Sequence, residues 1–334
     1  MSTATTSKNP PESAPADPTG SGVSFLRVLK SEWIKVTTVP STVILLAVTV
    51  LVMVGLAAGA AWGTVQLANE AADRATQSAP SAGATAEAAP TAVPGAAVPT
   101  AVPTEGAGVP TDGAAGDSAD DSPGGPPAAS SLVREVPSSG VLFGQLLIAS
   151  LAVVLVASEW GTGMIRSTFS AVPKRTPALL AKNLIIAVVS FIVGAGAAFI
   201  SFLVARPILG SADLSLSLGD DGVLASILNT GTFLALLAVF SMGIGTLLRN
   251  TAGGVVTAIG VIFVLPLVAT ILQNLGDWIS DAARFLPSNA GAQLVMAGTT
   301  AEGDLTQLQG GLVLGAWAAV LLITSIVVTK KRDV

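Results

Sequence analysis

Six long stretches of the chain contain no Asp, Glu, Lys or Arg, and they constrain the fold more than any other feature. Each is close to the roughly 20 apolar residues that an α-helix needs to cross the hydrocarbon core of a bilayer. Overall 51% of the residues are hydrophobic and only 11% are charged. The sequence therefore predicts an all-α polytopic membrane protein with six transmembrane helices, at about 41–62, 141–158, 183–205, 224–248, 255–275 and 311–329.

The segment between the first two stretches has a different composition. Residues 63–140 are rich in Pro, Ala and Thr, carry scattered acids, and repeat AVP at Ala92, Ala97 and Ala101. A chain with so much proline and so few large apolar groups cannot bury a core. We expect a mostly disordered acidic linker, with room for short helices only in its flanks. Residues 1–23 have no apolar run behind a basic start, which predicts a disordered tail and no signal peptide.

Charge is distributed very unevenly between the two sides of the predicted membrane protein. The side that holds residues 1–40, the loop 159–182, Arg249 and the tail 330–334 carries a net charge of +7, and the other side carries −12. Basic residues accumulate in cytoplasmic loops. We therefore expect a multi-pass protein of a bacterial plasma membrane, with both termini cytoplasmic and the linker 63–140 extracellular.

An amphipathic helix is predicted at 24–39, directly before the first span. One arc of this helix is apolar and contains Trp33, and the basic residues lie on the opposite side. This pattern is typical of a helix that lies in the membrane interface. The alternative is a solvated helix that packs on a soluble subunit. The apolar arc comprises Phe25, Leu26, Leu29, Trp33 and Val36, and the basic residues are Arg27, Lys30 and Lys35.

The loop between the second and third spans has the pattern of a short amphipathic helix with basic residues at its end. Met164, Ile165, Thr168, Phe169 and Val172 have the spacing of one apolar stripe. A proline at position 173 ends the helix, and Thr-Pro at 176–177 begins the next one. From the pattern alone, this is either a helix on the membrane surface or a docking helix for a cytoplasmic subunit.

Two further features lie near the last two spans. Pro266 is expected to kink the fifth span, because proline removes a backbone donor and clashes with the preceding turn. Residues 277–297 are expected to form an interfacial or re-entrant hairpin, with Trp278 and Phe285 at the outer membrane interface. Pro207, by contrast, is expected to end the third span.

The sequence also excludes several kinds of chemistry. There is no Cys, His or Tyr, so thiolate nucleophiles, histidine bases and the usual transition-metal ligands are missing. No GxxxxGK[ST] phosphate loop and no HExxH motif occurs. We expect no enzymatic activity and no catalytic, cofactor or metal residues in this chain. The spans contain no buried charge of the kind that marks a proton-coupled or sodium-coupled carrier.

Taken in order, these segments resemble the membrane subunit of ABC type 2 permeases, the exporter class with six spans per subunit, and in particular its actinobacterial members. The resemblance is carried by the loop, by SEWIK at 31–35, by Lys182 at the start of the third span, and by FLPSNAGAQL at 285–294. The linker 63–140 departs from the many relatives that have a compact loop there.

The resemblance implies a partner and a division of roles. Two permease subunits, identical or different, would each dock on a cytoplasmic ABC ATPase that holds ATP and Mg²⁺. The helix 162–172 would be the coupling helix, 24–39 the elbow helix and 277–297 the external gate. The implied ATPase-docking residues are Glu159, Gly161, Met164, Ile165, Arg166, Phe169, Pro173 and Arg175; the elbow residues are Arg27, Lys30, Trp33 and Lys35; the gate residues are Trp278, Phe285 and Pro287.

Two other functions stay open at this point. A stand-alone facilitator or carrier would need no partner, but carriers often show inverted internal repeats, and none is visible here. A non-transport membrane scaffold would use the acidic linker as a tether. An ATPase encoded beside this chain would favour the permease. The predicted spans consist mainly of Ala, Val, Leu and Gly, and a transport path lined by these residues would be suited to an apolar or amphipathic cargo.

Overall fold

The computed structural model describes residues 25–78, 129–164, 175–298 and 303–331, and every regular element in these ranges is helical. The first half contains α1 (Phe25–Thr38), α2 (Pro40–Ser78), α3 (Ala129–Glu135), η1 (Val136–Ser138), α4 (Val141–Gly161) and α6 (Arg175–Gly210). The second half contains α7 (Val223–Leu248), α8 (Thr251–Ile259), η2 (Gly260–Val264), α9 (Leu265–Leu272), η3 (Gln273–Leu275), α10 (Asp277–Ala283), α11 (Pro287–Val295) and α12 (Gln307–Lys331).

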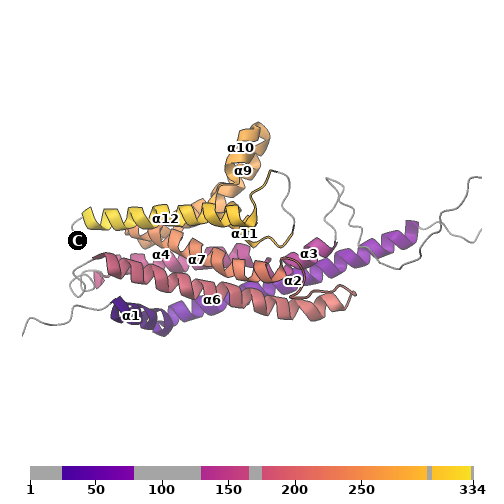
Figure 1. Ribbon diagram of the computed structural model, residues 1–334, viewed down its shortest axis with the longest axis horizontal. Helices are drawn as coiled ribbons and strands as arrows, with labels where there is room; N and C mark the ends of the chain where they lie inside the picture. Colours follow the sequence, from indigo (N-terminus) through magenta and orange to yellow (C-terminus); the bar gives the residue numbers. More distant parts are fainter. Residues whose placement is uncertain (1–24, 79–128, 165–174, 299–302, 332–334) are drawn as a thin grey trace, which may run out of the picture.

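Six helical segments are long and apolar enough to cross a membrane, which confirms the predicted number of spans. The chain is therefore a multi-pass membrane protein whose described regular elements are all helices. The spanning segments are Pro40–Arg74, Ser131–Gly161, Thr176–Gly210, Val223–Leu248, Thr251–Leu275 and Gln307–Lys331. Figure 1 shows the long helices side by side, with α1 and the C-terminal end of α12 at the same end of the bundle.

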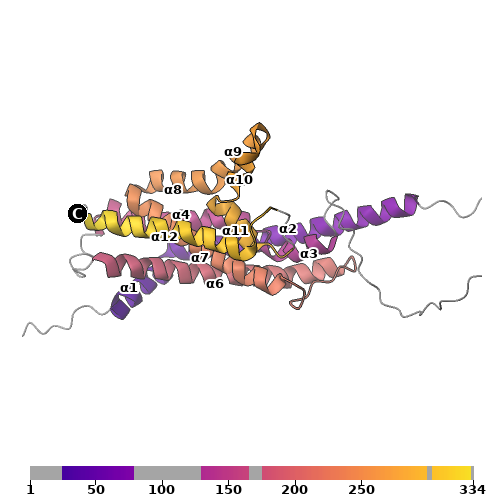
Figure 2. The same ribbon diagram turned by 45° about the horizontal axis from the view of Figure 1, so that its top comes forward.

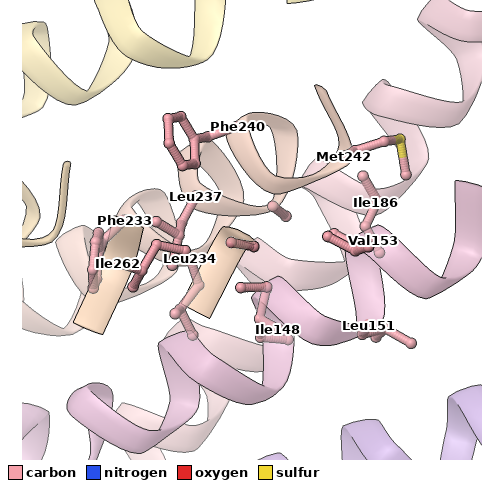
Figure 3. Close-up of a cluster of buried hydrophobic side chains, with 14 of the residues drawn as sticks. Ile148, Leu151, Val153, Ile186, Phe233, Leu234, Leu237, Phe240, Met242 and Ile262 are labelled. Carbon is pink, nitrogen blue, oxygen red and sulfur yellow. The ribbon is translucent and has the colours of Figure 1, made fainter. Parts of the chain in front are cut away.

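Helix α7 forms the centre of the bundle, because it packs against α4, α6, α11 and α12. Its large side chains Phe233, Leu234 and Leu237 are fully buried and meet Ile148 of α4 and Ile262 of η2 (Figure 3). Since bilayer lipid is as apolar as these side chains, close packing is what holds such helices together.

Glycines allow the closest approaches in this core. A Cβ atom on Gly231 would lie 2.7 Å from the carbonyl oxygen of Phe191, and one on Gly291 would lie 2.0 Å from Cε2 of Phe233. Any larger side chain at either position would therefore force α6 or α11 away from α7.

The fifth span is interrupted just before Pro266. Helix α8 ends at Ile259, and η2, a π-helical turn, leads into α9, which has the proline in its first turn. π-helical turns and prolines are both recognised causes of bends in helices. Figure 2 shows α8 running along the bundle, whereas α9 and α10 lean away from it.

Two helices extend beyond the predicted spans. Helix α2 continues from Pro40 through the predicted end at Trp62 to Ser78, so the start of the predicted linker is helical. Helix α6 continues through Pro207 to Gly210, and the prediction that Pro207 ends the third span is wrong. Proline removes one hydrogen bond from a helix, and the packing of Leu209 and Phe202 in a buried cluster offsets this loss.

Candidate functional site

Four charged side chains meet where α1, α4 and α6 converge, and we call them the charge cluster: Glu32, Lys35, Glu159 and Lys182. Glu32 and Lys35 lie on α1, Glu159 in the last turn of α4, and Lys182 near the start of α6. Glu32, Glu159 and Lys182 are buried, which is rare for charged residues unless they are paired.

Lys182 is the centre of the charge cluster. Its Nζ donates a hydrogen bond of 2.6 Å to Oε2 of Glu32 and one of 2.7 Å to Oε1 of Glu159. Lys35 Nζ donates to Oε1 of Glu32 at 2.7 Å and lies 3.5 Å from Oε1 of Glu159. Two carboxylates and two ammonium groups thus balance in charge, and one lysine joins three separate helices.

The charged neighbours of Glu32 and Lys35, the two residues of the charge cluster on α1, favour the ionised form of both side chains. Burial by itself would raise the pKa of Glu32, but the attraction of Lys182 and hydrogen bonds from Lys182 and Lys35 hold that pKa below its usual value. Burial would also lower the pKa of Lys35, but its hydrogen bond to Glu32 and the nearby carboxylates raise that pKa instead.

Apolar contacts on either side of the charge cluster fix α1 on α6. Val28 packs against Ala181, and Val36 packs against Ile185 and Val189. These contacts shield the pairs of Lys182, whose side chain is 10% exposed, from water, which strengthens the attraction between the opposite charges. Removing one partner of such a buried pair is costly, because it leaves the other charge without compensation.

One oxygen of the charge cluster has no hydrogen-bond partner in the described part of the chain. Oε2 of Glu159 is enclosed and accepts no hydrogen bond among the residues that the structure describes. The carboxylate of Glu159 is therefore held through Oε1 alone, by the two lysines.

A second cationic contact lies next to the charge cluster. The guanidinium carbon of Arg249 is 3.9 Å from the centre of the Trp160 ring, a distance typical of a cation–π interaction. Arg249 ends α7 with a left-handed backbone conformation (φ 53°). Asn250 then caps α8 by accepting a hydrogen bond from Gly253 N at 2.8 Å. The end of α4 is thus tied to both α6 and α7.

The predicted ATPase-docking residues fall into three groups in the structure. Glu159 is buried in the charge cluster, whereas Gly161 and Met164 are exposed at the end of α4 and just beyond it. Arg175 is the first residue of α6. The remaining docking residues, Ile165, Arg166, Phe169 and Pro173, and most of the predicted coupling helix lie outside the described residues.

The predicted elbow residues occupy two different faces of α1. Arg27, Lys30 and Trp33 are exposed. Lys35 was predicted on the side of α1 opposite the apolar arc, with Arg27 and Lys30; in the structure its ammonium group lies between Glu32 and Glu159. The apolar arc is divided: Leu26 (72% exposed) and Trp33 are exposed, whereas Leu29 and Val36 pack on α6.

The predicted gate residues lie at the opposite end from α1. Trp278 on α10 and Phe285 are both exposed, and Pro287 is buried at the start of α11. Trp317 Nε1 of α12 donates a hydrogen bond of 2.9 Å to the carbonyl oxygen of Phe285. Helix α11 itself packs into the bundle, where its last turn accepts hydrogen bonds from Ser226 and Asn229 of α7.

The sequence reasoning missed the role of Glu32. Its signal was present, since Glu32, Glu159 and Lys182 all lie at span boundaries on the same predicted side of the membrane. Opposite charges at the same membrane depth on neighbouring helices are candidates for ion pairs. Which face of α1 would turn towards α6 could not be read from the sequence.

Among the described residues, no group of His, Cys, Asp or Glu side chains could hold a metal ion. No protein-family model matches the chain, and no curated protein matches its sequence.

Proposed function

We propose that this chain is the membrane-spanning permease subunit of an ABC exporter, which forms the translocation path and is driven by a separate ATPase subunit. The observation that carries the proposal is the pairing of Glu159 with Lys182 at 2.7 Å. These two residues bracket the loop that holds the predicted docking helix, and both are joined to α1 through Glu32 and Lys35.

This arrangement is suited to passing a movement from a partner to the spans. A force on the loop would act on the last turn of α4 and the first turns of α6 together, because the ion pair of Glu159 with Lys182 joins these turns. The charge cluster would carry the same displacement to α1. In this proposal Glu159 positions the loop from inside the protein, and the exposed Met164 begins the surface that meets the ATPase.

The energy source must come from another chain in this proposal. The sequence holds no phosphate loop with the glycines and lysine that cradle ATP phosphates. ATP and Mg²⁺ would therefore bind in the partner ATPase, and this chain would have no catalytic residue of its own.

A second permease subunit would complete the path. Among the six spanning segments, the fifth, formed by α8, η2 and α9, buries the smallest share inside the bundle. Its exposed apolar side chains include Phe263, Leu267 and Ile271. This surface is available for a second subunit, and the hairpin from α10 to α11 would lie at the external mouth of the path.

The experiment that tests the proposal is purification of the full chain from native membranes in mild detergent, followed by identification of the proteins bound to it. We expect an ATP-binding subunit in the complex. Replacing Ile165 and Phe169 together (Ile165→Asp, Phe169→Asp) should abolish its recovery, because two charges would disrupt the apolar stripe while membrane insertion persists.

The control is Leu67→Asp, which places one such negative charge on an exposed apolar position of α2, beyond its predicted span. This variant should retain the ATPase. Equal recovery of the ATPase with the double variant and the control would exclude the loop as the docking surface, and the absence of any ATPase from the wild-type complex would exclude the permease function.

A further inference from the structure

A cavity of about 400 Å³ lies at the end of the bundle opposite to α1. This partly open cavity is lined by α2, by the segment from α3 through η1 to the start of α4, and by α11 with the residue that follows it. Its walls are largely apolar, with Ala60, Val136 and Val295 among them. Sites for small molecules commonly have volumes of about 300–1,000 Å³ and the same mixture of apolar walls with a few polar groups.

The hydroxyl groups in the wall all present oxygen lone pairs. Thr64 donates its proton to the carbonyl oxygen of Ala60 at 3.0 Å. Ser138 and Ser139 donate theirs to the carbonyl oxygens of Glu135 and Val136, at 3.0 and 2.8 Å. Since each proton is used within its own helix, each hydroxyl is left as an acceptor. A ligand that satisfies this wall must bring hydrogen-bond donors or a positive charge.

The same wall holds a carboxylate without a counter-charge. Glu135 is half-buried, and in the described part of the chain no lysine or arginine lies within ion-pair distance of it, although Arg134 is its neighbour in sequence. Gln293, also in the wall, has an enclosed side-chain oxygen with no donor among the described residues. Withdrawing an unpaired carboxylate from water is unfavourable, and a bound cation would offset this cost.

We propose that this cavity binds an ammonium group carried on an apolar body, with Glu135 as its counter-charge and the apolar wall around its body. A free amphiphilic amine and the ethanolamine headgroup of a lipid both supply this chemistry. The site does not depend on the proposed transport function, because its occupancy can be measured without an ATPase.

The test is equilibrium binding of radiolabelled decylammonium, whose NH₃⁺ group can donate hydrogen bonds, to the full chain in phosphatidylglycerol nanodiscs, with the signal of empty nanodiscs subtracted. We expect saturable binding that Glu135→Gln weakens at least about tenfold, because a charge-assisted contact is lost. Decanol, which has the same chain length and no charge, should bind more weakly than the cation and should not respond to Glu135→Gln. The control Glu70→Gln changes an exposed acid paired with Arg74 and should leave binding unchanged.

A second variant tests the cavity separately from its charge. Ala60→Phe should fill the space and abolish binding of both decylammonium and decanol. Adding phosphatidylethanolamine to the nanodiscs distinguishes the sources: competition with the labelled cation identifies a lipid headgroup, and its absence identifies a free amine. Binding that does not saturate, or that neither Glu135→Gln nor Ala60→Phe changes, would overturn the proposal.

Discussion

At the scale of single residues, Lys182 is the side chain that joins both carboxylates of the charge cluster. It joins a carboxylate from α1 to one from α4 while it sits on α6 itself. Its apolar stem lies among buried side chains, and its charge has two partners at hydrogen-bond distance. Without Lys182, two buried carboxylates would face each other with only Lys35 to balance them.

Lys182→Met should therefore destabilise the protein by about 3 kcal/mol, since breaking a buried ion pair leaves an uncompensated charge. The measurement is unfolding by SDS titration in mixed micelles. The control is Lys30→Met on the exposed face of α1, for which we expect a change within about 0.5 kcal/mol. Equal unfolding curves for the two variants would mean that the charge cluster contributes little to stability.

Glu32 shows where reasoning from residues alone reaches its limit. The sequence places it on a helix with an apolar arc of Phe25, Leu26, Leu29, Trp33 and Val36. Helical periodicity identifies such an arc, but the partner of a polar residue beside it depends on which neighbouring helix approaches. In the structure α6 approaches along Val28, Glu32 and Val36, and this brings Lys182 to Glu32.

At the scale of elements, the position of α11 depends on a glycine. Gly291 faces the ring of Phe233. Gly310 of α12 lies so close to the neighbouring Ala290 that a Cβ atom at position 310 would clash with the carbonyl oxygen of Ala290. Ser226 and Asn229 of α7 donate hydrogen bonds to backbone carbonyl oxygens of α11. This helix is thus part of the packed bundle, whereas the preceding α10 leans away from it (Figure 2).

Gly291→Ala should destabilise the protein by about 1–2 kcal/mol, because the clash with Phe233 outweighs the better helix propensity of alanine. The matched control is Gly315→Ala on α12, where a Cβ atom would meet nothing within 4 Å. That substitution should raise stability by about 0.5–1 kcal/mol. Unfolding in mixed micelles measures both, and a stabilising Gly291→Ala would show that α11 packs less closely on α7.

The spanning helices were the most predictable elements, because each is a long run without charge and the bilayer thickness fixes its length. Their ends were less predictable. The length of the apolar run does not predict that α2 continues to Ser78, since a helix can extend beyond the membrane through polar residues. Pro207 was misjudged because packing on both sides of a proline can sustain a helix through it.

At the scale of the whole molecule, the two ends of the bundle have different chemistry. One end holds the charge cluster, which ties α1, α4 and α6 together beside the predicted docking loop. The other end holds the cavity between α2, η1 and α11. Charge counts predicted the sidedness of the chain, but no pattern in the sequence predicted the cavity, because residues far apart in sequence enclose it.

The proposal as a whole requires an ATPase beside Met164, and the chain is well suited to a direct test because it has no native cysteine. A photoactivatable cross-linker is attached to Met164→Cys in native membranes, and the same probe is attached to Leu67→Cys as a control on α2. We predict a covalent adduct with an ATP-binding protein from position 164 and none from position 67. Labelling at position 164 that yields no such adduct, or yields the same adducts as position 67, would contradict the proposed function.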